Sequence, residues 1–201
     1  MSYGSFARMS AAALLLLAAS AAFAGEYRDP KGIFAVTYDD SIWSLDMDQS
    51  GDFGVECRKE VCKEAAVSCS VSTQRIPLVS TERIMANLDS KEIARVQLDA
   101  FAEQKVAAEK TSPGKVTWDK ASDVSPQLVQ PYESRLIAGR SVLQGEFRMS
   151  IVGERARYVS YMTAGANHLI AIMCVSSDEA IGESRPRFDG LMARFRSPAP
   201  K

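Results

Sequence analysis

The chain has 201 residues, 46% of them hydrophobic, and its 24 basic and 25 acidic residues leave a formal net charge of -1. Because charges of both signs are interspersed, the composition argues against a nucleic-acid-binding surface. It also lacks the polybasic run that anionic lipid attracts.

The first 24 residues have the three-part layout of a secretory signal peptide. Arg8 is their only charge, an apolar stretch follows it, and small residues in an A-x-A arrangement precede Gly25. Signal peptidase accepts this arrangement, so cleavage before Gly25 is predicted, and the apolar stretch is too short to span about 30 Å of hydrocarbon. We therefore expect a periplasmic or secreted protein with one α+β domain over 25–201, a flexible tail from about 197 and no integral membrane segment.

Two short strands are predicted around a turn near the start of this domain. Residues 33–38 alternate in the manner of a strand, Asp39-Asp40-Ser41 has turn chemistry, and the alternation resumes at Trp43 and Leu45.

The next segment is expected to form a strand, a charged tip and a second strand. In its second half, Val67, Cys69, Val71 and Thr73 share one face, and serines occupy the other. This pattern predicts a half-buried strand in which Cys69 points with the apolar residues.

The periodicity changes after residue 80, where a helix is predicted from about 90 to 110. Asp89 and Glu92 match a capping box at its start. Its apolar stripe is Ile93, Val96, Gln97, Ala100 and Phe101. Residues 115–131 are expected to be a connection, with a short candidate strand at 116–118.

Four strands in a meander are predicted next, over 132–138, 141–152, 156–163 and 168–175. The last of them is apolar on both faces, which indicates a central strand that is covered on both sides. A second amphipathic helix is then predicted from the spacing of Phe188, Leu191, Met192 and Phe195, with Pro186 near its start.

This order of elements resembles the Mog1/PsbP-like α/β/α sandwich. The resemblance depends on FAVTYDDSIWSL, QGEFRMSIVGERARYVSYMTAGANHLIAIMCV and RFDGLMARF, and it covers most of the mature chain. Ser41-Ile42 departs from the proline that often precedes the tryptophan in such strands. The resemblance implies an antiparallel sheet flanked by a long middle helix and a carboxy-terminal amphipathic helix. It also implies kinship with nuclear-transport adaptors, photosystem accessory subunits and bacterial envelope proteins, which work mostly by binding.

Tests for catalytic and metal-binding patterns favour structural interpretations. His168 is the only histidine and is predicted to lie where a hairpin enters its strand, a place typical of a turn-capping residue. The cysteine spacing does not match paired zinc ligands. Cys57 and Cys62 flank a charged tip and lack the C-x-x-C pattern of catalytic dithiols, although a thiol-redox function stays an alternative.

Carboxylates near the first strands offer a second alternative. Asp39, Asp40, Asp46, Asp48 and Asp52 could supply the acids of a hydrolase, but sequence places no two of them at a defined separation. Asp46, Asp48 and Asp52 resemble the ligands of a calcium-binding loop. Such a loop needs a bidentate glutamate at its twelfth position, which is Cys57 here.

Arginines cluster in the predicted meander. Arg148, Arg155 and Arg157 could gather on an exposed sheet face as an anion- or partner-binding patch. The competing interpretation is a solvated face on which Glu133, Glu146 and Glu154 are cross-strand partners of the arginines.

The four cysteines of an exported chain predict two disulfides with three possible pairings. Strand direction favours Cys57 with Cys62 as a local staple and Cys69 with Cys174 as a bridge across the core between distant strands. The long bridge is expected to contribute on the order of 4 kcal/mol and the short one on the order of 2 kcal/mol.

The sequence therefore predicts a small, exported, non-enzymatic binding or accessory module of the bacterial envelope. Its expected partner is another envelope protein, and no cofactor, metal or catalytic residue is predicted. The partner's identity and the oligomeric state stay open. The alternatives are a periplasmic hydrolase that uses loop carboxylates and a thiol-redox or metal-handling protein.

Overall fold

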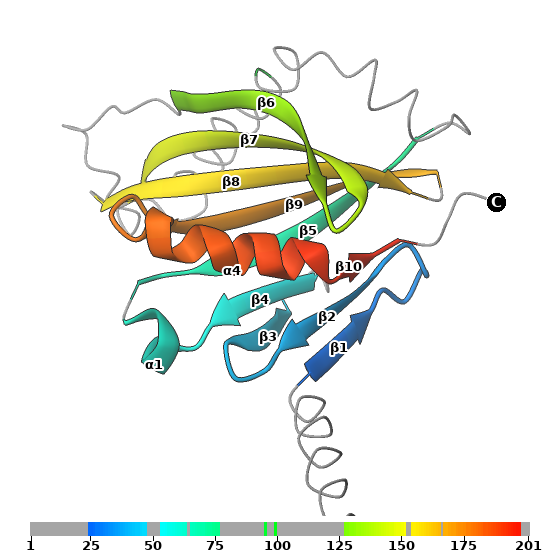
Figure 1. Cartoon of the computed structure of the whole chain (residues 1–201), viewed down its shortest axis with the longest axis horizontal. Helices are drawn as coiled ribbons and strands as arrows, with labels where there is room; N and C mark the ends of the chain where they lie inside the picture. Colours follow the sequence, from blue (N-terminus) through cyan, green and yellow to red (C-terminus); the bar gives the residue numbers. More distant parts are fainter. Residues whose placement is uncertain are drawn as a thin grey trace, which may run out of the picture.

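The computed structural model describes residues 24–47, 53–63, 65–76, 127–151, 154–165 and 167–197, together with Arg95 and Asp99. Over these residues, strands dominate. A seven-stranded antiparallel sheet in the order β3-β4-β5-β9-β8-β7-β6 forms the centre of the molecule (Figure 1). Its strands are β3 (Trp43–Met47), β4 (Phe53–Cys57), β5 (Ser68–Arg75), β6 (Gln127–Ile137), β7 (Arg140–Ile151), β8 (Glu154–Gly165) and β9 (His168–Ser177).

The predicted meander is present as β6 to β9, each strand pairing with the next. β9 has β5 on one side and β8 on the other, so the prediction of a central strand is confirmed. Buried and half-buried residues alternate along it, so one of its faces is only partly covered. β6 begins at Gln127, inside the stretch expected to be a connection. Among the described strands β6 lies at the sheet edge, a position that tolerates Pro131 because one side of an edge strand needs no backbone donors.

A second, three-stranded sheet has the order β1-β2-β10 and consists of β1 (Ala24–Arg28), β2 (Ala35–Asp39) and β10 (Phe195–Arg196). The strands expected on both sides of the Asp39 turn exist as β2 and β3, but they belong to different sheets. Asp39 Oδ1 accepts hydrogen bonds from the Ser41 amide and hydroxyl at 3.0 and 2.5 Å. This turn carries the chain from the small sheet to the large one.

Two helices are described, α1 (Lys59–Cys62) and α4 (Ile181–Ala193). α4 lies with the small sheet against one face of the seven-stranded sheet (Figure 1). Phe188, Leu191 and Met192 of α4 are buried there, as predicted. Phe195 is also buried, but it lies in β10, because α4 ends at Ala193 and the chain then pairs with β2.

Alternation along β5 is only partly as predicted. Val67, Cys69 and Val71 are buried, but Thr73 is exposed, because β4 pairs with β5 only over its first residues, Ser68 to Ser70.

The helix predicted from about 90 to 110 falls outside the described residues, except for Arg95 and Asp99, which are both helical and exposed. The candidate strand at 116–118 and the signal peptide also lie outside them. These three features stay predictions. None of the helices in the described part of the chain is long and apolar enough to cross a membrane.

Candidate functional site

The polar face of β7 is buried. Gln144 and Glu146 are 0% and 2% exposed, although the sequence predicted that this face is solvated. Both residues alternate onto the sheet face against which α4 packs, so the helix covers them. Burying a carboxylate is costly unless charged partners accompany it.

Those partners form a chain of ion pairs between β7, β8 and the start of α4. Arg157 donates from Nε and Nη2 to Asp178 Oδ1 at 2.8 and 2.5 Å, and from Nη1 to Glu146 Oε2 at 3.4 Å. Arg148 Nε lies 3.0 Å from Asp178 Oδ2, and Arg185 pairs with the other oxygen of Glu146. We call this set, Arg148, Asp178, Arg157, Glu146 and Arg185, the ion-pair chain.

The electrostatics of the ion-pair chain favour its charged forms. Partial burial opposes ionisation of Asp178, but its hydrogen bonds and charge attraction to Arg157 and Arg148 are stronger, so the pKa of this carboxyl is below 3.8. The hydrogen bond to Glu146, with the charge of that carboxylate, raises the pKa of Arg185.

Further polar contacts tie α4 to the sheet. The Tyr161 hydroxyl donates to Asp189 at 2.7 Å, and burial followed by this hydrogen bond raises the pKa of Tyr161. At the other end of α4, Arg140 Nη2 donates to the carbonyls of Met192 and Ala193 at 3.5 and 3.3 Å. A cation at a helix carboxy terminus satisfies unpaired carbonyls there. α4 is therefore fixed at both ends.

The structure brings together only two of the three arginines predicted as a patch. Arg148 and Arg157 are directly opposite each other on β7 and β8, and both contact Asp178. Arg155 is exposed and lines a separate pocket. An anion-binding role for the three stays a prediction, and at Arg148 and Arg157 an anion would compete with Asp178.

Acid is expected to weaken this site through Asp178. Because its pKa is lower in the folded chain than in the unfolded one, its ionisation contributes stability above about pH 4, and this stability is lost as pH falls through the folded pKa. We expect Asp178→Asn to be less stable than the parent protein at pH 6, with the difference shrinking below pH 4. Urea unfolding at pH 3, 4, 5 and 6 measures it, and a difference that is constant over this range would contradict the assignment.

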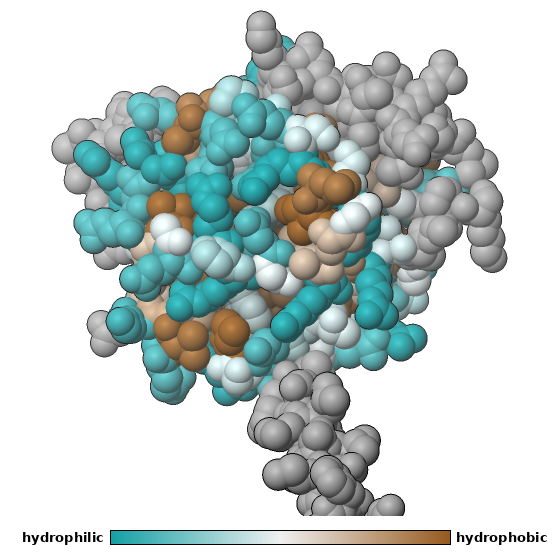
Figure 2. All heavy atoms as spheres, viewed as in Figure 1, coloured by the Kyte–Doolittle hydropathy of each residue, from teal (hydrophilic) through white to brown (hydrophobic). Residues whose placement is uncertain are grey.

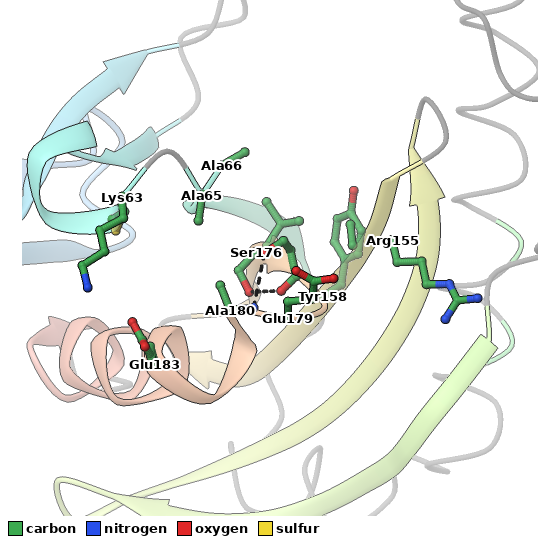
Figure 3. Close-up of a pocket in the computed structure, with 13 residues that line it drawn as sticks. Lys63, Ala65, Ala66, Arg155, Tyr158, Ser176, Glu179, Ala180 and Glu183 are labelled. Carbon is green, nitrogen blue, oxygen red and sulfur yellow. Dashed lines mark hydrogen bonds between the residues drawn. The ribbon is translucent and has the colours of Figure 1, made fainter.

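The pocket beside the ion-pair chain has a volume of about 800 Å³ (Figure 3). Its wall combines the segment after α1, the starts of β8 and α4, and the end of β9. Tyr158, Val175 and two alanines, Ala65 and Ala66, give it apolar surface. Lys63 and Glu183 lie on one side of it, whereas the guanidinium of Arg155 is turned away from the other labelled side chains (Figure 3).

The backbone around this pocket is held by local hydrogen bonds. The Ala180 amide donates to the carbonyl and the hydroxyl of Ser177 at 3.2 and 3.3 Å, and the Ser176 hydroxyl donates to the Ser177 carbonyl at 3.0 Å. Burial raises the pKa of Tyr158 to about 12, so this phenol is neutral at physiological pH.

Two disulfides join the four cysteines, in the pairing that strand direction favoured. Cys57 and Cys62 link the end of β4 to α1, and Cys69 is bonded to Cys174. We expected the second bond to cross the core between distant strands, and this expectation is wrong. The bond joins directly opposite residues of the adjacent strands β5 and β9, which are far apart only in sequence.

The other residues considered from sequence lie apart from the ion-pair chain. His168 is the first residue of β9, opposite Gly165 and Arg75. Asp39 caps its turn, Asp46 is exposed on β3, and Asp48 and Asp52 fall outside the described residues. Within the described part of the chain, no three His, Cys, Asp or Glu side chains are grouped as metal ligands.

Sequence reasoning missed Asp178 and Arg185. Asp178 is in the turn after β9, and Arg185 is one turn into α4. Their partners are 20 or more positions earlier in the chain. The sequence showed only that Asp178 precedes a predicted helix and that Arg185 lies inside it. Neither position identifies the residue with which the side chain pairs.

Solved structures provide the comparison that identifies the fold. No protein-family model matches the sequence, and no curated protein matches it. Cyanobacterial PsbP (CyanoP) from Synechocystis sp. PCC 6803 is similar in structure, with a TM-score of 0.61 and 14% identity over 90% of this chain and 96% of that one.

Two further likenesses are weaker. A protein from Bacteroides thetaiotaomicron VPI-5482 gives a TM-score of 0.50 and 10% identity over 86% of this chain and 48% of that one. LpqN, involved in cell envelope biogenesis of Mycobacterium tuberculosis, gives a TM-score of 0.41 and 10% identity over 87% and 92% of the two chains. The antiparallel sheet, the carboxy-terminal helix and the likeness to PsbP show that this chain has the Mog1/PsbP-like fold.

Proposed function

We propose that this protein is a small, exported, non-enzymatic accessory module of the bacterial envelope that binds another envelope protein through strand β6. The compartment is supported by two observations of different kinds. The first 24 residues have the layout of a secretory signal. All four cysteines are paired, and structural disulfides persist in oxidising compartments.

The exposed apolar surface of β6 carries the proposal. Five large hydrophobic side chains are exposed among the described residues, and three of them are on this strand: Leu128 at 39%, Val129 at 41% and Leu136 at 76%. Figure 2 shows apolar surface at the turn between β6 and β7. Exposed apolar side chains at a surface site are typical of protein-protein contacts.

The position of β6 also suits a protein partner. Among the described strands, β6 pairs only with β7 and is an edge of the large sheet, and we propose that a partner adds an extended segment there. Addition of a strand to a sheet edge obtains affinity from main-chain hydrogen bonds and specificity from side-chain contacts. The ion-pair chain ties α4 to β7, the strand that pairs with β6.

Site-specific photocrosslinking in intact cells tests this function. A photoreactive amino acid is placed at Leu136 or at Val129, and the control position is Glu60, which is exposed on α1. We expect one defined protein adduct from both β6 positions and none from the control. Adding Leu136→Glu to the Val129 variant should abolish the adduct. Equal crosslinking from Glu60, or no adduct from either β6 position, would contradict the proposal.

A further inference from the structure

One of the two disulfides lies at the surface of the pocket. Cys62 is part of the pocket wall, next to Lys63 at the end of α1. The residue is 6% exposed, and the pocket that it lines has a volume of about 800 Å³. A thiol that enters the pocket can therefore approach a sulfur of the Cys57–Cys62 bond.

A cation is next to the same sulfur. Arg187 Nη1, from α4, lies 3.8 Å from Cys62 Sγ. A nearby guanidinium stabilises a thiolate, which is both the nucleophile and the leaving group of disulfide exchange. The helix thus supplies to Cys62 the electrostatic environment that reactive cysteines have in other proteins.

The second disulfide provides an internal contrast. Cys69 and Cys174 are 2% and 0% exposed, in the middle of the seven-stranded sheet, and neither lines the pocket. That bond closes a separation of 105 residues, whereas Cys57 and Cys62 are 5 apart. The loop-entropy contribution to disulfide stability grows with loop length, so it is smaller for the short bond.

We propose that the Cys57–Cys62 bond is a thiol-disulfide exchange site that accepts two electrons from an external dithiol entering the pocket. In the first step, a thiolate of the dithiol attacks Cys62 Sγ and forms a mixed disulfide. The bond between the two cysteines breaks, and its electron pair leaves with Cys57 Sγ, which takes a proton from water.

In the second step, the other thiolate of the dithiol attacks the dithiol sulfur that is bonded to Cys62 in the mixed disulfide. This forms an intramolecular disulfide in the dithiol and expels Cys62 as a thiolate beside Arg187. The dithiol has been oxidised by two electrons and has released two protons, and the two cysteines have been reduced. This chemistry is independent of β6 and goes beyond the proposed accessory function.

Partial reduction of the mature protein with dithiothreitol tests the order of the two bonds. Samples equilibrated at increasing dithiothreitol concentration are quenched with acid, alkylated and mapped by peptide mass spectrometry. We expect alkylated Cys57 and Cys62 at concentrations where Cys69 and Cys174 are still bonded. Reduction of the Cys69–Cys174 bond first, or of both bonds together, would overturn the proposal, and this arm needs no variant.

Variants of Arg187 test the role of the cation. A full charge pair at this separation in water corresponds to about a fivefold change in an equilibrium constant, so Arg187→Gln should lower the equilibrium constant for reduction of the Cys57–Cys62 bond by dithiothreitol about fivefold, at a pH where the Cys62 product is a thiolate. Arg187→Lys keeps the charge and should retain most of the equilibrium constant for reduction, and Arg28→Gln, which changes an exposed arginine of β1, is the control. Circular dichroism checks that each variant is folded. An unchanged equilibrium constant for reduction in Arg187→Gln would overturn the role of Arg187, and the crosslinking outcome at β6 would be unaffected.

Discussion

Arg157→Ala is expected to lower the free energy of unfolding by about 3–5 kcal/mol, because it leaves a buried carboxylate without one of its partners. The Glu146 side chain is 3% exposed and the Arg157 side chain 12% exposed, so water cannot replace the lost contact. Asp178 also loses the arginine that donates two hydrogen bonds to it. Urea unfolding at neutral pH, followed by circular dichroism, measures the change.

The matched control is Arg28→Ala. Arg28 pairs with Glu26 at 3.0 Å, but its side chain is 78% exposed, and exposed pairs contribute only about 0–1 kcal/mol. Adding Glu146→Gln to Arg157→Ala removes the unpaired charge and should recover part of the loss. A loss below about 1 kcal/mol in Arg157→Ala would show that burial does not make this carboxylate depend on Arg157.

Removal of the Cys69–Cys174 bond is expected to have the second large effect. The bond closes a separation of 105 residues, so the double variant Cys69→Ala/Cys174→Ala should lose about 4 kcal/mol of unfolding free energy in the loop-entropy account. Both cysteines are buried in adjacent strands at the middle of the sheet, and their truncation adds a packing cost. Urea unfolding of the oxidised proteins gives the value.

The other disulfide provides the comparison. Cys57→Ala/Cys62→Ala removes a bond between residues 5 apart, and about 2 kcal/mol is expected from the same account. If this variant were the less stable of the two, the ranking by loop length would be wrong for this protein.

The strands of the meander could be predicted because the alternation that identifies a strand involves residues close together in the sequence. Alternation identified β7, β8 and β9, and the apolar character of both faces of HLIAIMCV identified the central strand. The pairing of Cys69 with Cys174 was favoured because both alternate with buried neighbours on their own strands. The sequence did not show to which of the two sheets each strand belongs. β2 and β3 are separated by one turn, yet β2 pairs with β1 and with the carboxy-terminal β10, whereas β3 pairs with β4 in the other sheet.

The candidate site was predictable only as a set of charges. The sequence places Glu146, Arg148 and Arg157 on one sheet face, since their spacing has the period of a strand. It does not state whether that face meets water or a helix. Strand alternation is the same in both cases, so the burial of Glu146 could not be derived from it.

The sequence by itself determined the strands of the meander and their order in the chain, the amphipathic character of α4 and the number of disulfides, because each depends on residues close together in the chain. It did not predict β1 or β10. Tertiary structure decided that the polar face of β7 is buried as well as its apolar face, since α4 covers the polar face and brings Arg185 to Glu146 across 39 positions of sequence. It also decided that Arg187 lies beside Cys62 in a pocket wall. Contacts of this kind form only when distant segments pack together, and the physical reason is that charge pairing and solvent exclusion depend on distance in space.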